Sequence, residues 1–107
     1  MSLNAISGTA DSDCIRVRAL IQNQVMLLLV DFGSSTSFIS TAMTRRLGLA
    51  THKSTPATVK VASGEVLMSD SYVPEVQWWA NGHTYTTDMR VIDISAYDTI
   101  LGFDMIG

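Results

Sequence analysis

Residues 25–40 read Val25-Met-Leu-Leu-Leu-Val-Asp-Phe-Gly-Ser-Ser-Thr-Ser-Phe-Ile-Ser40, and this stretch decides the fold. Its six leading apolar residues predict a strand that is covered on both faces. The strand ends at Asp31, and Gly33 and a run of hydroxyl residues then predict a loop rich in backbone N–H donors. Such donors favour an ionised carboxylate, whereas apolar surroundings oppose it. Asp31 is therefore either a functional carboxylate or the first residue of a turn, and spacing alone leaves both open.

Short strands are predicted on both sides of this stretch. Cys14–Ile21 alternates apolar and polar residues, and Gln22-Asn23-Gln24 is a turn signal, so a hairpin with 25–30 is expected. After the loop, Ser40 or Thr41 can cap a short helix that runs to Leu47, with Gly48 as its stop signal.

The second half of the chain predicts two more hairpins. One joins Thr58–Ala62 to Glu65–Met68 through Ser63-Gly64, and the other joins Val73–Trp79 to His83–Ile92 around Ala80-Asn81-Gly82. Pro56 is expected in a linker, and one of the adjacent residues Trp78 and Trp79 is expected in the core. A last apolar segment, Thr99–Leu101, leads into Gly102. This spacing predicts an all-β, barrel-like domain over residues 11–107, after a loose arm at 1–10.

Composition narrows the class of protein. The chain has 107 residues, 47% of them apolar, which suits one small globular domain. Its net charge of −3 and scattered basic residues argue against a nucleic-acid or membrane partner. The single cysteine, Cys14, excludes an internal disulfide and is interpreted as structural. With no signal peptide in the sequence, a soluble, intracellular and cytoplasmic protein is expected.

Other chemistries fit the sequence poorly. Asp31-Phe32-Gly33 spells a kinase metal-binding tripeptide, but the chain is too short for a kinase and lacks its other motifs. His52 and His83 have no neighbouring ligand residues, so no metal or other cofactor is expected. Asp98 and Asp104 flank Thr99–Phe103, but neither follows a long buried strand into a Gly-Ser loop. Chemistry that needs two carboxylates would therefore take the second from another copy of the chain.

Four segments, in order, resemble the proteases encoded by gypsy-type LTR retrotransposons. Residues 25–40 resemble the active-site segment, in which an apolar run leads into Asp-Ser-Gly or Asp-Thr-Gly. The other three segments resemble the lead-in, the flap hairpin and the closing apolar-apolar-Gly motif, and they are 3–8, 59–65 and 97–104. The resemblance implies a retropepsin-like (acid protease) closed barrel with a flap hairpin and one or two short helices. It also implies a homodimeric aspartic endopeptidase that processes a polyprotein.

Site residues follow from the resemblance position by position. It implies that Asp31 is catalytic and that Phe32, Gly33 and Ser34 form the active-site loop. Gly102 would pack beneath that loop, and the flap tip that closes over a peptide would be Ala62, Ser63 and Gly64.

Two departures from the family pattern bear on activity. Phe32 stands where the family has Ser or Thr, whose hydroxyl links the two active-site loops across the dimer. The domain is also expected to lack the C-terminal helix and strand that follow in the family. Three functions stay open: an endopeptidase impaired by Phe32, an inactive dimerisation or peptide-binding module, and a peptide-binding domain that never dimerises.

Overall fold

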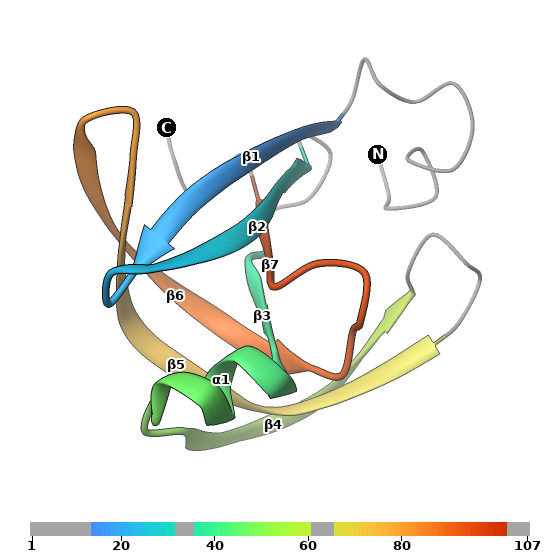
Figure 1. The fold of residues 1–107 in the computed structure, drawn as a ribbon. Coiled ribbons are helices and arrows are strands. Elements are labelled where there is room, and N and C mark those ends of the chain that lie inside the picture. The colour runs from blue at the N-terminus through green and yellow to red at the C-terminus, as the bar shows by residue number, and fades with distance from the viewer. Residues whose placement is uncertain (1–13, 32–35, 61–65, 103–107) are drawn as a thin grey trace.

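The computed structural model describes residues 14–31, 36–60 and 66–102 (Figure 1). These residues form seven strands and one helix. In chain order the elements are β1 (Cys14–Ile21), β2 (Gln24–Asp31), β3 (Phe38–Ser40), α1 (Thr41–Leu47), β4 (His52–Lys60), β5 (Val66–Ala80), β6 (His83–Ile92) and β7 (Thr99–Gly102). None of the described helices has the length and apolar character needed to span a membrane. The predicted arm at 1–10 lies outside the described residues.

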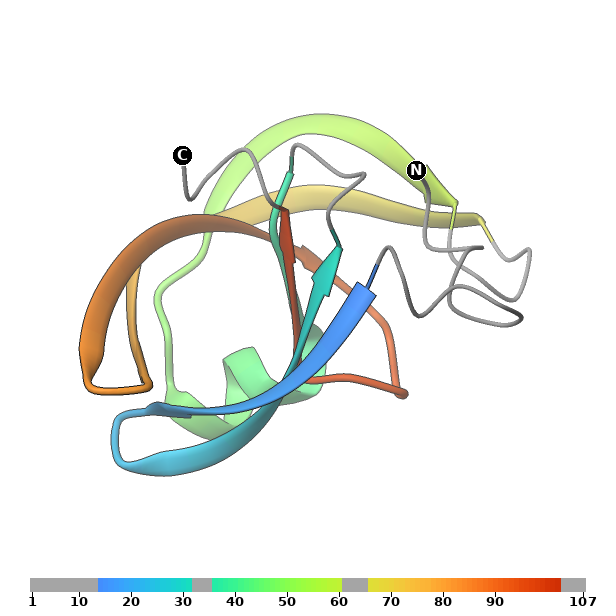
Figure 2. The same ribbon diagram turned by 90° about the horizontal axis from the view of Figure 1, so that it is seen from above.

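The strands form one sheet that bends round into a ring. Its order is β1-β2-β7-β3-β6-β5-β4, and Leu20 of β1 also pairs with Trp79 of β5. That pairing joins the two ends of a six-strand ring, and β4 remains outside it, bonded to β5 (Figure 2). The all-β prediction is confirmed, and the ring is compatible with the expected closed barrel.

β7 is central to the topology because it lies between two strands that are far from it in sequence. It runs parallel to β2 and antiparallel to β3. β3 in turn runs parallel to β6. These pairings bring the end of β2 beside the end of β7 at one rim of the ring.

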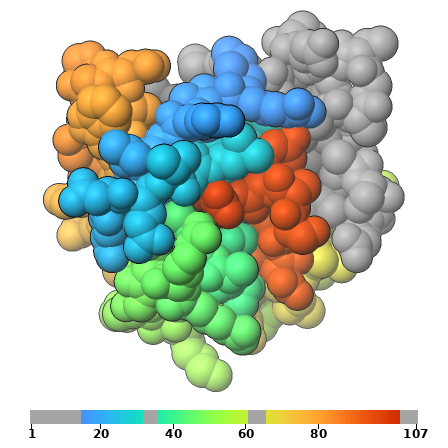
Figure 3. Space-filling view, viewed as in Figure 1, coloured from blue at the N-terminus to red at the C-terminus, as the bar shows by residue number. Residues whose placement is uncertain are grey.

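The core fills the ring and is closed at one end by the helix. Met26 and Leu28 of β2 pack with Met89 of β6 and with Met43 and Leu47 of α1. Figure 3 shows α1, in green, directly below β2 on the front face. The helix is positioned by the residues that the sequence indicated. The Ser40 hydroxyl accepts from the Met43 N–H at 3.0 Å, and Gly48 ends the helix in the left-handed conformation, with φ 65°.

Two of the three predicted hairpin turns lie within the described residues, and both are confirmed. Both central residues have positive φ in each two-residue turn: 51° and 63° at Gln22 and Asn23, and 51° and 82° at Asn81 and Gly82. Such turns match the twist of antiparallel strands. Gln24 belongs to β2 rather than to the turn.

The two tryptophans divide as expected. Trp78 is buried, stacks on Tyr85 with ring centroids 4.5 Å apart and donates its indole N–H to Thr87 at 3.1 Å. Trp79 is 44% exposed.

Three details of the prediction were wrong. Pro56 lies within β4, not in a linker, because β4 is an edge strand whose pairing is interrupted there by a bulge. β5 is one strand from Val66 to Ala80, where the sequence indicated two, because the polar residue Ser69 is buried and hydrogen-bonded. Val25, at the start of the apolar run, is 61% exposed.

Candidate active site

Asp31 lies at the rim of the ring, where two parallel strands end together. It is the last residue of β2, and it is in register with Cys14 on one side and with Gly102 of β7 on the other. Its side chain is fully buried within the single chain. Gly102 is therefore beside Asp31, as the sequence indicated, and both belong to one short stretch of sheet.

A buried serine fixes the far end of the active-site segment to the same glycine. The Ser37 hydroxyl accepts a hydrogen bond from the Gly102 N–H at 3.0 Å, and the side chain is 1% exposed. Both ends of the segment are thus fixed to Gly102, since Asp31 pairs with it in the sheet and Ser37 through this bond. The predicted loop residues Phe32, Gly33 and Ser34 lie between these ends and outside the described residues.

Ser37 was not among the site residues predicted from the sequence. The signal that could have identified it is its place, as a hydroxyl directly before the short apolar strand Phe38–Ile39. A polar residue that enters a buried strand must find a hydrogen-bond partner. That partner is 65 positions away, so local sequence does not reveal it.

Asp98 has a structural role. Its carboxylate Oδ2 accepts from the Leu27 N–H at 2.8 Å, and its own N–H donates to the Leu27 carbonyl at 3.0 Å. Its carbonyl accepts from the Ser40 N–H at 2.8 Å. Asp98 thus joins the start of β7 to the N-cap of α1 and to Leu27 of β2. Leu27 precedes Asp31 on the same strand. The other flanking carboxylate, Asp104, lies outside the described residues.

The β4–β5 hairpin curves past the ends of β2, the strand that carries Asp31, and of β7 (Figure 2). Val59 and Leu67, one from each strand of the hairpin, pack against a buried cluster from β2, β3, β6 and β7, whose members are Leu29, Phe38, Ile92 and Ile100. Lys60 and Val66 form the last described pair of the hairpin. The predicted flap residues Ala62, Ser63 and Gly64 lie beyond that pair, outside the described residues.

The described residues contain no group of three or more His, Cys, Asp or Glu side chains that could hold a metal ion. His52 lies beside Tyr72, with ring centroids 5.6 Å apart. The chemical candidate at the rim is therefore a single carboxylate, Asp31, held between two strands below a hairpin.

Comparisons with known proteins identify this arrangement. A family model described as retroviral aspartyl protease matches residues 1–107, so the chain belongs to that family. No curated protein sequence matches it significantly. The resemblance drawn from the sequence is confirmed at the level of this family.

Two solved structures share the fold. The EIAV protease complexed with the inhibitor HBY-793 is 28% identical, with a TM-score of 0.66, over 86% of this chain and 84% of that one. The retroviral protease-like domain of Ddi1 from Leishmania major is 21% identical, with a TM-score of 0.69, over 86% of this chain and 74% of that one. The retropepsin-like fold predicted from the sequence is confirmed.

Proposed function

We propose that the chain is an aspartic endopeptidase domain that works as a homodimer and contributes one catalytic carboxylate, Asp31, per chain. The observation that carries this proposal is the position of Asp31 at the joint ends of β2 and β7, in register with Gly102, in a chain of the retroviral aspartyl protease family. Two such carboxylates side by side share one proton, because like charges so close cannot both ionise. One then activates water as a base, and the other donates a proton to the peptide carbonyl.

The second chain is essential to this chemistry. Among the residues that the structure describes, Asp31 is the carboxylate at the end of β2, and its side chain is fully buried in the single chain. Contact between Asp31 and a peptide therefore requires the segments at the rim to rearrange. In the proposed homodimer, this rearrangement would accompany the association of the two chains. The β4–β5 hairpin, whose Val59 and Leu67 already pack over the site strands, would act as the flap. The substrate proposed from the family resemblance is a polyprotein of a retrotransposon.

The test is cleavage of a quenched fluorescent peptide library by the parent chain and by Asp31→Asn. The Asn side chain keeps the shape but cannot share the proton, so cleavage should fall to background. Asp93→Asn, which changes an exposed carboxylate, is the matched control and should leave cleavage unchanged. Activity should peak at acid pH, where the pair of carboxylates holds one proton. Equal cleavage by parent and Asp31→Asn would exclude the aspartic mechanism.

A second candidate function is an inactive dimerisation or peptide-binding module, and Phe32 favours it. By the family resemblance, residue 32 faces its own copy near the two-fold axis, so its effect is doubled. Losing the hydroxyl's hydrogen bonds costs roughly 0.5–1.5 kcal/mol each, and overpacking by a ring typically costs about 1–3 kcal/mol. The sum predicts that Phe32 weakens association roughly 100-fold or more, since each 1.4 kcal/mol is tenfold.

Sedimentation and peptide cleavage by the parent and by Phe32→Ser separate the two functions. Tighter association and faster cleavage by the Ser variant would support an endopeptidase that Phe32 impairs. Stable dimers in both chains with cleavage in neither would favour the inactive module. A Ser variant that associates no better and cleaves no faster would show that Phe32 is not the limiting residue.

A further inference from the structure

β4, the edge strand of the hairpin, contains a bulge whose polar groups accept hydrogen bonds from a side chain of β6. The β4–β5 register breaks between Lys53 and Ala57, which leaves Ser54 and Thr55 outside the paired ladder. Arg90, on β6, hydrogen-bonds to both of these residues. Its guanidinium donates to the Ser54 hydroxyl at 3.2 Å and to the Thr55 carbonyl at 2.7 Å. The side chain thus reaches from the ring to a strand with which β6 forms no ladder pairs.

The Arg90 side chain also bonds to β5, the strand that lies between β6 and β4. Arg90 donates to the Ser69 hydroxyl at 3.1 Å and to the Ser69 carbonyl at 3.0 Å. These bonds, with the two to β4, use four of the five N–H groups of a guanidinium. Ser69 is fully buried, and its two bonds to Arg90 are partly buried. One side chain therefore fastens both strands of the hairpin to β6.

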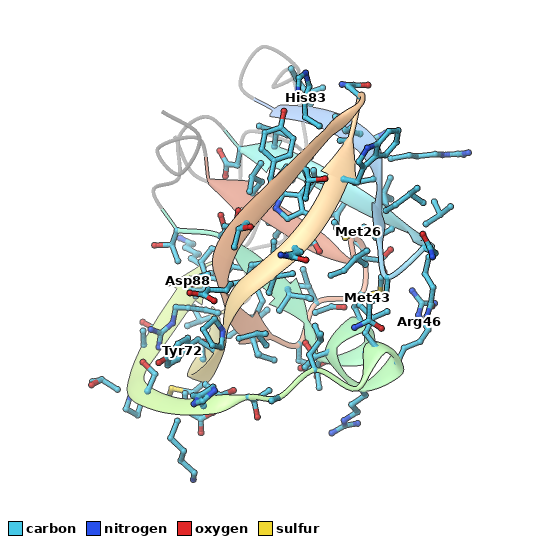
Figure 4. The ribbon with its side chains drawn as sticks, turned by 90° about the vertical axis from the view of Figure 1, so that its left-hand side faces the viewer. Met26, Met43, Arg46, Tyr72, His83 and Asp88 are labelled. Atoms are coloured by element: carbon cyan, nitrogen blue, oxygen red, sulfur yellow. The ribbon has the colours of Figure 1, made fainter. Side chains whose placement is uncertain are left out.

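A second bulge, in β5, is satisfied from the same face of β6. The β5–β6 register shifts between Val73 and Val76, where Glu75 has a φ of 52°. The Glu75 N–H donates to the carboxylate of Asp88 at 2.8 Å. Asp88 precedes Arg90 by two residues, and alternate residues of a strand share a face. Figure 4 shows Asp88 and Tyr72 on one side of the β5–β6 pair. Both residues line a cavity together with Arg90.

The backbone of Arg90 contacts the active-site segment. The Arg90 N–H donates to the Ser37 carbonyl at 2.9 Å, and the Ser37 hydroxyl accepts from Gly102. A single residue thus binds the active-site segment through its main chain and the hairpin through its side chain. Bulges are over-represented beside active sites, where they bend a strand and redirect its side chains.

A ligand-binding role for Arg90 is less consistent with these contacts. A cavity of about 500 Å³ adjoins it, lined also by Thr36, Ser37, Ser54 and Asp88. Most of the guanidinium donors are already taken by the hairpin, and the Asp88 carboxylate in the same wall would repel an anion. The arginine is therefore better placed to hold protein than to bind a ligand.

We propose that Arg90 is a positioning residue that holds the hairpin over the active-site segment, through its side-chain bonds to β4 and β5 and its main-chain bond to Ser37. Its importance for peptide capture rests on the proposed endopeptidase function. The fastening itself is independent of that function and can be measured in the free chain.

The experiment is amide hydrogen exchange on the full chain, the parent and Arg90→Met, with Arg45→Met as control. Arg45 is an exposed arginine of α1, so its replacement removes the same charge without touching the hairpin. In Arg90→Met the amides that pair Ala57–Lys60 with Val66–Ser69 should exchange about tenfold faster, because local opening no longer has to break the four side-chain bonds. Amides of the β1–β2 ladder should stay within about twofold of the parent. Arg90→Lys should restore the protection in part, because an ammonium has three donors in place of five.

Three outcomes would overturn the proposal: no change in the hairpin amides, an equal rise in the hairpin and in β1–β2, or the same hairpin rise in Arg45→Met. If Arg90→Met does not fold, Ser54→Ala removes one of the two side-chain bonds from Arg90 to β4. A smaller rise confined to the hairpin amides is then the expected result. No rise in Ser54→Ala would equally overturn the proposal. The failure of the endopeptidase proposal would show separately, as unchanged cleavage by Asp31→Asn, and would leave these exchange rates as they are.

Discussion

Ser37→Ala should lower the stability of the domain by an amount that the structure allows us to bound. The substitution removes the hydroxyl that accepts from the Gly102 N–H at 3.0 Å. Both residues are buried, Ser37 at 1% exposure, so water cannot replace the lost acceptor without a rearrangement. An unsatisfied buried donor costs about 1–3 kcal/mol. In a domain near this size, each kcal/mol lowers the Tm by roughly 4–8 °C.

Urea unfolding followed by tryptophan fluorescence measures this loss. The midpoint should fall while the slope m is unchanged, because a lost buried bond alters stability and not the surface exposed on unfolding. Ser95→Ala, at an exposed serine before β7, is the control and should stay within about 0.5 kcal/mol of the parent. If Ser37→Ala were as stable as Ser95→Ala, the bond from the Gly102 N–H to the Ser37 hydroxyl would not hold the active-site segment at the rim.

Three further substitutions test the rest of the framework by the same unfolding assay. Asp98→Ala should cost about 1.5–3 kcal/mol, because the Leu27 N–H loses a charged acceptor; a loss below 0.5 kcal/mol, roughly the effect of a surface change, would refute its structural role. Gly48→Val should cost about 1–2 kcal/mol from the left-handed backbone alone, since a Cβ there meets nothing within 4 Å. Trp78→Ala should lower the free energy of unfolding by about 3–5 kcal/mol, and the same change at the half-exposed Trp79 should lower it much less. Equal losses would mean that the two side chains are equally buried.

Local sequence signals predicted most of the fold, because they act over a few residues. The Asn81-Gly82 dipeptide, the Ser40 cap and the Gly48 stop each specify a backbone conformation within one turn. The alternation of Cys14–Ile21 and the apolar run after it located β1 and β2. Asp31 and Gly102 were recognised as neighbours only through the family resemblance. They are far apart in the sequence, and local patterns do not encode contacts over such separations.

What the sequence did not reveal depends on pairs that are distant along the chain. The bonds of Ser37 to Gly102 and of Asp98 to Leu27 span 65 and 71 positions. The Arg90 bonds to β4 span 35 and 36. The sequence predicted two separate strands, Glu65–Met68 and Val73–Trp79, where the structure has β5. Ser69 lies between them, and a buried serine needs a hydrogen-bond partner, which here is on another strand. Polar residues within otherwise apolar strands are therefore the positions at which sequence reasoning was weakest.

The contacts that hold the active-site segment explain how the fold can coexist with Phe32. The segment is fixed by the register of Asp31 with Gly102, by the Ser37 bond to Gly102, and by the Arg90 bond to the Ser37 carbonyl. None of these contacts uses the side chain of residue 32. A change at that position can therefore leave the single chain folded, and the cost should fall on the association of two chains. It follows that Phe32→Ser should change sedimentation and cleavage while leaving the free energy of unfolding of the monomer, measured in urea, within about 0.5 kcal/mol of the parent. A larger change in that free energy would mean that residue 32 also supports the single chain.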